Sequence, residues 1–326
     1  MPVSHTFESP LAVIGIGACL AGNAVRYDGS GKSPNPHVIA LYNNFHIRPF
    51  CPEMGVGMGV PRPPIQLVGD EQTVRVLDVA THSRDYTEDI AAYADKVLAL
   101  APEICGYILV KSSPSCGYGR VKRFSGKGYL LAFDQQGVFA AALERADPLL
   151  PLEDDGRLND PALRDSFLTR ACAYHDWKLL RAGGLCTEKL NTFYDNYKYL
   201  VMAHDVSSYK SLASMLENAE ERPLETLAAE FIGAFMRALK QRATRRSHSN
   251  VLLLLSGCLK RDISDDERQR LKALIDQYRT GKVPLQVPVT LLRQHFADNL
   301  SGYLDRQVFL DSYPDIQGEA SSQHRL

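Results

Sequence analysis

Three cysteines share one sequence setting, in which a short apolar run ends in a turn. They are Cys19 after residues 11–18, Cys51 after residues 45–50, and Cys116 after residues 107–110. Each is flanked by glycine, proline or serine, which lets the chain turn sharply and direct backbone N–H groups at a bound anion or sulfur. Thiolates are soft ligands that suit zinc or iron–sulfur clusters. Three thiolates without a fourth protein ligand leave a metal position open, which indicates chemistry at the metal.

The elements around these cysteines are predicted from hydrophobic patterning. Short apolar runs predict strands, which are expected at residues 11–18, 45–50, 107–110, 128–133 and 138–143. Apolar residues at helical spacing predict a helix over residues 90–101, after a polar cap region. This alternation favours an α/β domain with a mostly parallel sheet. Because ligands bind at the carboxyl ends of parallel strands, we expect the three cysteines to meet in one crevice.

The remaining four cysteines, Cys105, Cys172, Cys186 and Cys258, do not follow predicted strands. Cys105 precedes the strand at residues 107–110, and a rise of about 3.3 Å per residue places it about 15–20 Å from Cys116. We interpret all four as core thiols, since unpaired cysteine is among the most buried residue types. The alternative for the first three cysteines is that they too are unrelated buried thiols.

The pattern changes to helices after about residue 150. A polar run at residues 153–160, after Pro148 and Pro151, is expected to be a linker. Helices are expected at residues 161–180, 193–203, 209–218, 224–242, 249–261, 265–278 and 289–298, and the tail at 317–326 is expected to fray. The predicted architecture is an α/β domain at residues 1–152, a helical linker at 153–190 and an all-helical domain at 191–326.

Composition restricts the partners and the compartment. The 326 residues include 37 Lys and Arg against 38 Asp and Glu, so no overall basic field recruits nucleic acid or an anionic membrane. No apolar run approaches the roughly 20 residues that span a bilayer, and the N-terminus lacks a signal-peptide pattern. We therefore expect a cytoplasmic protein. Thiols stay reduced there, so the seven cysteines do not indicate a disulfide framework.

Five motifs in order carry a family resemblance. They are Ala18-Cys19-Leu20 with Gly22, residues 25–29 (VRYDG), Cys51-Pro52-Glu53, residues 57–64 (GMGVPRPP) and Ser113-Pro114-Ser115-Cys116-Gly117. Together they resemble the TudS-type thiouracil and thiouridine desulfidases over about residues 10–150. The second half is similar to the YbgA-type domain, through residues 198–204 (KYLVMAH), 244–251 (TRRSHSNV) and 283–292.

The resemblance implies a 4Fe-4S cluster held by Cys19, Cys51 and Cys116. It also implies that Glu53 and one serine, either Ser113 or Ser115, act in catalysis. Glu53 lies two residues from Cys51, where a carboxylate can activate water as a general base.

A nucleotide substrate would need cations and hydrogen-bonding groups near the cysteines. We expect its binding residues to be Arg26, Tyr27, Asp28, Arg62 and Lys111, with the cations on the phosphate and Asp28 on the ribose or base. The helical half contains a basic cluster, to which an RNA fragment, a nucleotide or the first domain could bind. This cluster comprises Arg242, Arg245, Arg246, His248, Lys260 and Arg261.

The predicted function is an iron–sulfur desulfidase that converts 4-thiouridine 5'-monophosphate to UMP and hydrosulfide, with thiouracil-type bases as further substrates. Two alternatives stay open at this point. One is a zinc-thiolate hydrolase that uses the same thiols. The other is a non-enzymatic RNA-binding or redox-sensing protein with a structural cluster. The residues leave the oligomeric state and the role of the helical half open.

Overall fold

The chain divides into two units, with the boundary between Lys178 and Leu179. The computed structural model describes residues 11–33, 35–70, 72–219, 222–259, 262–298 and 306–310. Among these residues, no helix is long and apolar enough to cross a membrane. The prediction of an α/β half followed by a helical half is confirmed.

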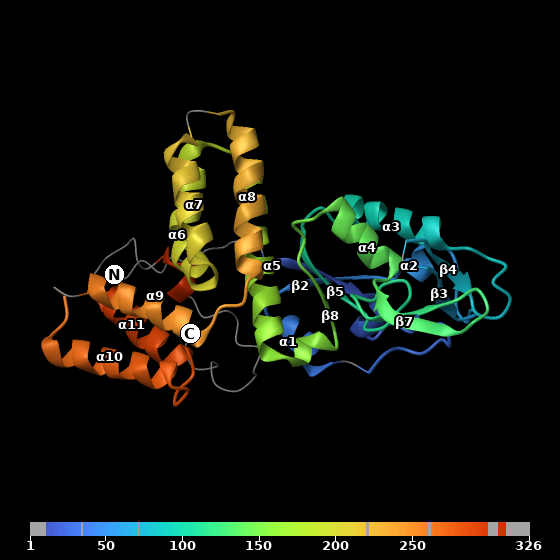
Figure 1. Ribbon diagram of the computed structural model, residues 1–326, viewed down its shortest axis with the longest axis horizontal. Coiled ribbons are helices and arrows are strands. Elements are labelled where there is room, and N and C mark those ends of the chain that lie inside the picture. Colours follow the sequence, from blue (N-terminus) through green and yellow to red (C-terminus); the bar gives the residue numbers. More distant parts are fainter. Residues whose placement is uncertain are drawn as a thin grey trace. The chain divides into compact units, whose positions relative to one another are not determined.

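The first unit is built on sheet A, whose four strands are all parallel (Figure 1). The strands are β1 (Val13–Gly17), β2 (His46–Phe50), β5 (Ile104–Leu109) and β8 (Leu152–Asp154), in the order β2-β1-β5-β8. Every residue of β5 is buried, as expected for a central strand covered on both faces.

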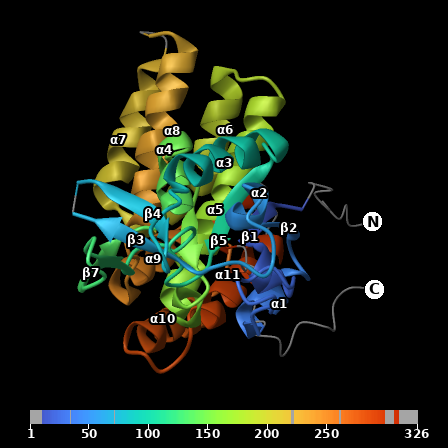
Figure 2. The same ribbon diagram turned by 90° about the vertical axis from the view of Figure 1, so that its right-hand side faces the viewer.

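Helices cover both faces of sheet A. On one face lie α3 (Thr87–Leu100) and α4 (Val138–Ala146), which pack side by side (Figures 1 and 2). Phe139 of α4 contacts Tyr107 of β5, with ring centroids 5.6 Å apart. On the other face, Phe167 and Ala171 of α5 (Pro161–Ala182) pack against Gly106. Successive residues of β5 therefore face opposite helical layers.

A second sheet, sheet B, has the order β4-β3-β6-β7. Its strands are β3 (Ile65–Gly69), β4 (Val74–Asp78), β6 (Val121–Phe124) and β7 (Leu130–Gln135). The two outer pairs are antiparallel, and β3 pairs with β6 in parallel. Of these strands, only β7 corresponds to one predicted from the sequence, at residues 128–133.

Two local predictions were wrong. Residues 138–143 lie in α4, because Phe139, Ala140 and Leu143 form one buried helical face. Residues 153–160 were expected to be a linker, but β8 completes sheet A and the acidic run from Glu153 to Asp155 is buried. The polar composition indicated a linker, but these carboxylates are held by hydrogen bonds inside the unit.

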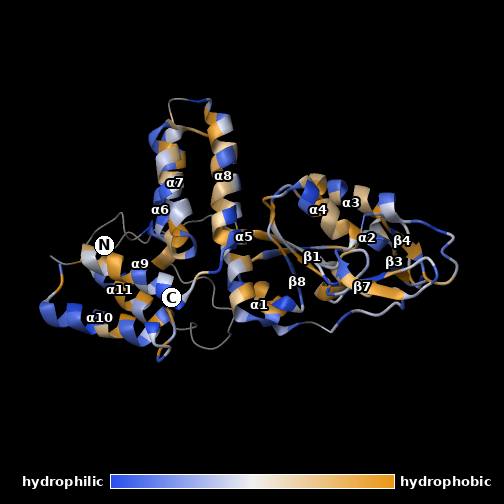
Figure 3. Ribbon diagram, viewed as in Figure 1, coloured by the Kyte–Doolittle hydropathy of each residue, from blue (hydrophilic) through white to orange (hydrophobic). Residues whose placement is uncertain are grey.

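The second unit is helical in its described part, apart from loops and short turns. Its helices are α6 (Thr187–His204), α7 (Val206–Glu217), α8 (Leu224–Lys240), α9 (Arg245–Cys258), α10 (Asp265–Arg279) and α11 (Gln286–Asp298). An aromatic core of Phe193, Tyr197, Phe231 and Phe235 joins α6 to α8. Helix α10 is largely hydrophilic and turns a few apolar residues inward (Figure 3). The tail expected to fray at 317–326 lies outside the described residues.

Candidate active site

The three cysteines at predicted strand ends line one cavity of about 380 Å³. Gly17, at the end of β1, pairs with Phe50, at the end of β2, so the segments that carry Cys19 and Cys51 leave sheet A side by side. Cys116 is tied to the end of the neighbouring strand β5, since its carbonyl oxygen accepts a hydrogen bond from the backbone N–H of Val110 at 3.2 Å. The parallel sheet thus brings three positions that are far apart in sequence to one edge.

Proline and glycine fix the two loops that carry Cys51 and Cys116. Cys51 is extended because it precedes Pro52, which begins the short helix α2 (Pro52–Gly55). This puts Glu53 in the first turn of α2. The Cys116 loop packs against the start of α4, where a Cβ on Gly137 would lie 2.5 Å from the carbonyl oxygen of Ser115. Only glycine permits that approach.

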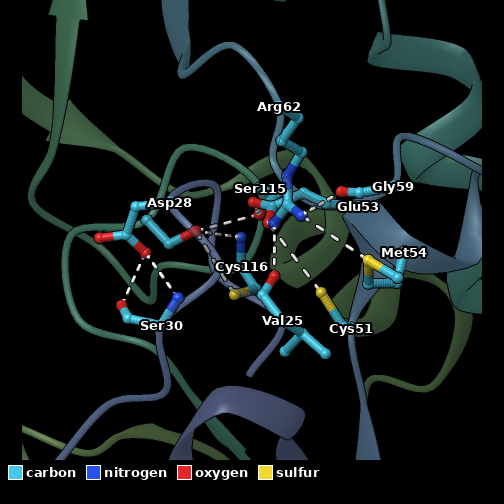
Figure 4. Close-up of polar contacts among 11 residues, drawn as sticks. Val25, Asp28, Ser30, Cys51, Glu53, Met54, Gly59, Arg62, Ser115 and Cys116 are labelled. Atoms are coloured by element: carbon cyan, nitrogen blue, oxygen red, sulfur yellow. Dashed lines mark hydrogen bonds and ion pairs between the residues drawn. The ribbon is translucent and has the colours of Figure 1, made fainter. Parts of the chain in front are cut away.

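The Glu53 carboxylate is held from two sides. Arg62 forms an ion pair with Oε2 of Glu53, and the Ser115 hydroxyl donates to Oε1 at 2.6 Å (Figure 4). The guanidinium of Arg62 also donates to the carbonyl oxygens of Gly59 at 2.7 Å and Val25 at 2.8 Å. Arg62 is only 7% exposed, so its donors serve the protein itself. The expected role of Arg62 in substrate binding stays untested, but its contacts are those of a residue that positions Glu53.

The two serines have different positions. Ser113 lines the cavity, whereas Ser115 is fully buried behind it. Their hydroxyl oxygens are 3.0 Å apart. Because the Ser115 hydroxyl donates to Glu53, it accepts from Ser113, and Ser113 in turn accepts from the backbone N–H of Cys116 at 3.2 Å. A hydrogen-bonded chain therefore runs from the cavity through Ser113 and Ser115 to Glu53.

Burial keeps the thiols of this site neutral when no cation is bound. It raises the pKa of Cys19 to about 11 and that of Cys116 to about 12, and it also raises the pKa of Cys51. The Glu53 carboxylate adds to each of these shifts, because a thiolate beside it would be repelled. A bound metal cation would reverse this balance, since metal coordination deprotonates thiols.

Cationic side chains border the same cavity. Arg26 and Lys111 line it, as does Tyr27, which is 45% exposed. Asp28 is not part of the lining, and its carboxylate accepts hydrogen bonds from the backbone and hydroxyl of Ser30 at 3.0 and 2.6 Å. The expected contact of Asp28 with a ribose or base stays a prediction.

Asp155 organises the cavity rim, a role that sequence reasoning missed. Its carboxylate pairs with Lys32 at 2.5 Å and accepts from the backbone N–H of Lys111 at 2.8 Å. Its carbonyl oxygen accepts from the Asn35 side chain at 2.8 Å. The only signal was a carboxylate in an acidic run just beyond Pro151, a composition that a surface loop shares.

Residues 14–155, which contain the whole cavity, match the family model described as 2-thiouracil desulfurase. The protein YbbK of Bacillus subtilis is 33% identical over 153 residues, which cover 44% of this chain and 97% of that protein. The chain belongs to the 2-thiouracil desulfurase family. The family supports an enzyme that acts on thiouracil-type molecules.

The other comparisons concern the second half and one solved structure. Residues 198–314 match a family model described as a protein of unknown function, DUF1722. The protein YbgA of Escherichia coli is 29% identical over 153 residues, covering 47% of this chain and 90% of that protein. A solved structure, the 4Fe-4S-dependent thiouracil desulfidase TudS, is 29% identical to this chain, with a TM-score of 0.36. The match covers 47% of this chain and 97% of the TudS chain.

The donor set of this 2-thiouracil desulfurase site suits an iron–sulfur group. Within the described residues, no three His, Cys, Asp or Glu side chains converge closely enough to hold a single metal ion. The thiols of Cys19, Cys51 and Cys116 instead surround a shared space, together with apolar residues such as Phe50, Pro64 and Val110. Soft sulfur donors in a largely apolar cavity are the environment in which iron–sulfur clusters are bound.

The cysteines outside the site were assigned correctly only in part. Cys105 is buried in β5, and its thiol donates to the carbonyl oxygen of Val13 at 3.1 Å. Cys172 is half-buried, whereas Cys186 and Cys258 are exposed, so the interpretation of the last two as core thiols was wrong. Cys186 is the N-cap of α6 and Cys258 lies in the last turn of α9, and the ends of helices are less covered by neighbouring elements than their middles.

The basic cluster in the helical unit is partly used within that unit. His248 is hydrogen-bonded to the hydroxyl of Tyr278 at 2.8 Å, and the guanidinium of Arg245 lies against Gly281. Arg246 is exposed beside a surface groove, while Lys260 and Arg261 lie outside the described residues. None of the comparisons supports an RNA partner.

Proposed function

We propose that this 2-thiouracil desulfurase family member removes sulfur from 4-thiouridine 5'-monophosphate, using a 4Fe-4S cluster held by Cys19, Cys51 and Cys116. Water replaces the sulfur, so that the thiocarbonyl and one water give a carbonyl and hydrogen sulfide. Thiouracil-type bases are expected to be further substrates.

One observation carries this proposal. Three thiols from three separate loops line the same cavity as a carboxylate, Glu53, that is fixed by an arginine and a serine. The cavity lies wholly within the part of the chain that matches the 2-thiouracil desulfurase model. Thiols that served only as core residues would not need a positioned carboxylate beside them.

The bound cluster would supply an iron without a protein ligand, a soft Lewis acid for the sulfur of a thiocarbonyl. The protein residues supply the proton chemistry. Glu53 lines the cavity, and its Oε1 keeps a lone pair beyond the bond from Ser115. Glu53 can therefore accept a proton from a water molecule that attacks the ring carbon bearing the sulfur.

Ser113 is the serine that can touch a substrate. Ser113 lines the cavity and its hydroxyl is connected through Ser115 to Glu53, so a proton can pass along this chain without rearrangement of the backbone. Ser115 is fully buried and acts by fixing Glu53 and Ser113. The geometry thus favours Ser113 for direct contact and Ser115 for positioning.

The cations at the rim favour a phosphorylated substrate. Arg26 and Lys111 line the cavity, and Lys111 is held by the bond from its backbone to Asp155. A phosphate takes several N–H donors and positive charges at once. An uncharged base would not offer these cations an anionic partner, so we expect the nucleotide to bind more tightly than the base.

The test is anaerobic reconstitution of the full chain with iron and sulfide, followed by an assay of 4-thiouridine 5'-monophosphate. Loss of the thiocarbonyl absorbance together with release of one sulfide per UMP is the expected result. Cys19→Ala, Cys51→Ala and Cys116→Ala should each abolish it, whereas the control Cys258→Ala, at an exposed cysteine outside the site, should retain it.

Three results would overturn the proposal. One is full iron and sulfide content in all three cysteine variants. Another is zinc without acid-labile sulfide in protein purified anaerobically, which would favour a zinc-thiolate hydrolase. The third is RNA binding with no loss of the thiocarbonyl band, which would favour a non-enzymatic protein.

A further inference from the structure

Tyr107 has a hydroxyl that the proposed chemistry does not use. The residue lies at the centre of β5 and is fully buried. Among the described residues, its hydroxyl oxygen has no hydrogen-bond partner. Buried hydroxyl groups in folded proteins are nearly always bonded, so an unpaired one indicates a role at a bound group.

The ring of Tyr107 is aimed from β5 across β1. In the sheet, Tyr107 pairs with Gly15, and a Cβ on Gly15 would lie 2.4 Å from Cδ2 of the tyrosine ring. Glycine at this position thus gives the ring room to lie over β1, on the face that α4 covers through Phe139. Beyond β1 in the sheet comes β2, the strand directly before Cys51.

The chain on both sides of the Tyr107 ring leads into the site. Gly17, two residues after Gly15 on β1, and Val110, three residues after Tyr107, line the cavity. Burial raises the pKa of Tyr107, and Cys116, Tyr93, Cys51 and Cys19 raise it further, because a phenolate would be repelled by a negative charge on any of them. A tyrosine hydroxyl is an O–H donor at neutral pH, and Tyr107 itself is not among the residues that line the cavity.

We propose that the Tyr107 hydroxyl donates a hydrogen bond to a sulfur atom of the iron–sulfur group held by Cys19, Cys51 and Cys116. This inference rests on the proposed function. A thiolate or sulfide of such a group is an anionic acceptor, and the Tyr107 hydroxyl has no other acceptor among the described residues. Hydrogen bonds to the sulfurs stabilise the more reduced, more negative state and strengthen the retention of the metal.

The decisive variant is Tyr107→Phe, which keeps the ring and removes only the oxygen. In the protein without metal, the melting temperature should stay the same or rise, because an unpaired buried hydroxyl is removed. In the reconstituted protein, the midpoint potential should shift to a more negative value, and release of iron to a chelator should be about tenfold faster. Exchange of solvent hydrogen for deuterium should shift the iron–sulfur vibrations less than in the wild type.

A matched control is Tyr174→Phe, which also removes a single tyrosine hydroxyl. That hydroxyl donates to Asp147 at 2.8 Å, so its loss should lower the melting temperature but leave the potential and the release rate unchanged. The two variants should therefore show opposite patterns.

The outcomes separate this inference from the proposed function. Wild-type levels of iron and sulfide, potential and release rate in Tyr107→Phe would overturn the role of the hydroxyl and leave the desulfurase proposal intact. A melting temperature of the metal-free variant that falls as it does for Tyr174→Phe would show that the hydroxyl serves the fold, which also overturns the inference. Failure of the wild-type chain to take up iron and sulfide would overturn both proposals.

Discussion

Replacement of Arg62 by lysine distinguishes a positioning residue from a substrate-binding residue. Arg62 donates to Glu53 and to the carbonyl oxygens of Gly59 and Val25, which a planar guanidinium can reach together. In Arg62→Lys, the compact ammonium group can keep the bond to Glu53 but not the other two. Hydrogen bonds from a charged donor contribute about 1.5 kcal/mol or more each, so the free energy of unfolding of the first unit should fall by about 3 kcal/mol.

The assay uses the one tryptophan of the chain. Trp177 is buried on α5, the helix that packs against β5, so its fluorescence in urea reports the unfolding of that helix. In the reconstituted enzyme, Arg62→Lys should lower kcat because Glu53 loses its fixed position. The KM for 4-thiouridine and for its 5'-monophosphate should change by the same factor, since Arg62 does not serve the phosphate.

Arg26→Lys is the matched control, because Arg26 lines the same cavity and its guanidinium lies 6.0 Å from the ring centroid of Tyr27. It should change the free energy of unfolding by less than about 0.5 kcal/mol and raise KM for the monophosphate more than for the nucleoside. A positioning role for Arg62 is refuted if Arg62→Lys leaves stability at the wild-type value and raises only the KM of the phosphorylated substrate.

Three further predictions concern other residues. Ser115→Ala should lower the free energy of unfolding by about 1–3 kcal/mol, because Glu53 loses a buried donor. Ser113→Ala should lower kcat, with a smaller loss of stability in the same urea assay. Equal effects of the two variants on kcat and on stability would contradict direct contact for Ser113 and positioning for Ser115. Burial lowers the pKa of His248 from 6.5 to about 4, so its contribution to stability is complete above pH 6.5 and is lost as the pH falls towards 4. His248→Gln should flatten the dependence of the melting temperature on pH over this range, and an unchanged slope would count against it. Brief alkylation of the native metal-free protein should modify Cys186 and Cys258 first, because they are exposed, and mass spectrometry maps the modified residues. Preferential labelling of Cys19, Cys51 or Cys116 would contradict the burial described above.

The predictable part of the fold came from strongly patterned segments. The apolar run before Cys19 became β1, and the helical periodicity around Ile90 became α3. Apart from β7, the short strands of sheet B were not predicted, because they are partly exposed and take their conformation from pairing with one another. Residues 138–143 were misread for a related reason, since a short apolar run fits a strand or a buried helix equally well.

The candidate site was predictable where residue type and strand ends coincide. Cys19, Cys51 and Cys116 were placed at one edge by topology alone, and they line one cavity. Side-chain roles were harder to predict, because they depend on partners distant in sequence. Asp155 lies 44 residues from the Lys111 backbone that it binds, and Tyr107 is an ordinary apolar strand residue until its unpaired hydroxyl is seen.

The most direct test of the proposed function is sulfide release by the anaerobically reconstituted chain given 4-thiouridine 5'-monophosphate. We predict one sulfide and one UMP for each thiocarbonyl lost, with none from Cys51→Ala and undiminished release from Cys258→Ala. A wild-type chain that holds iron and acid-labile sulfide but leaves both 4-thiouridine 5'-monophosphate and thiouracil unchanged would contradict this function.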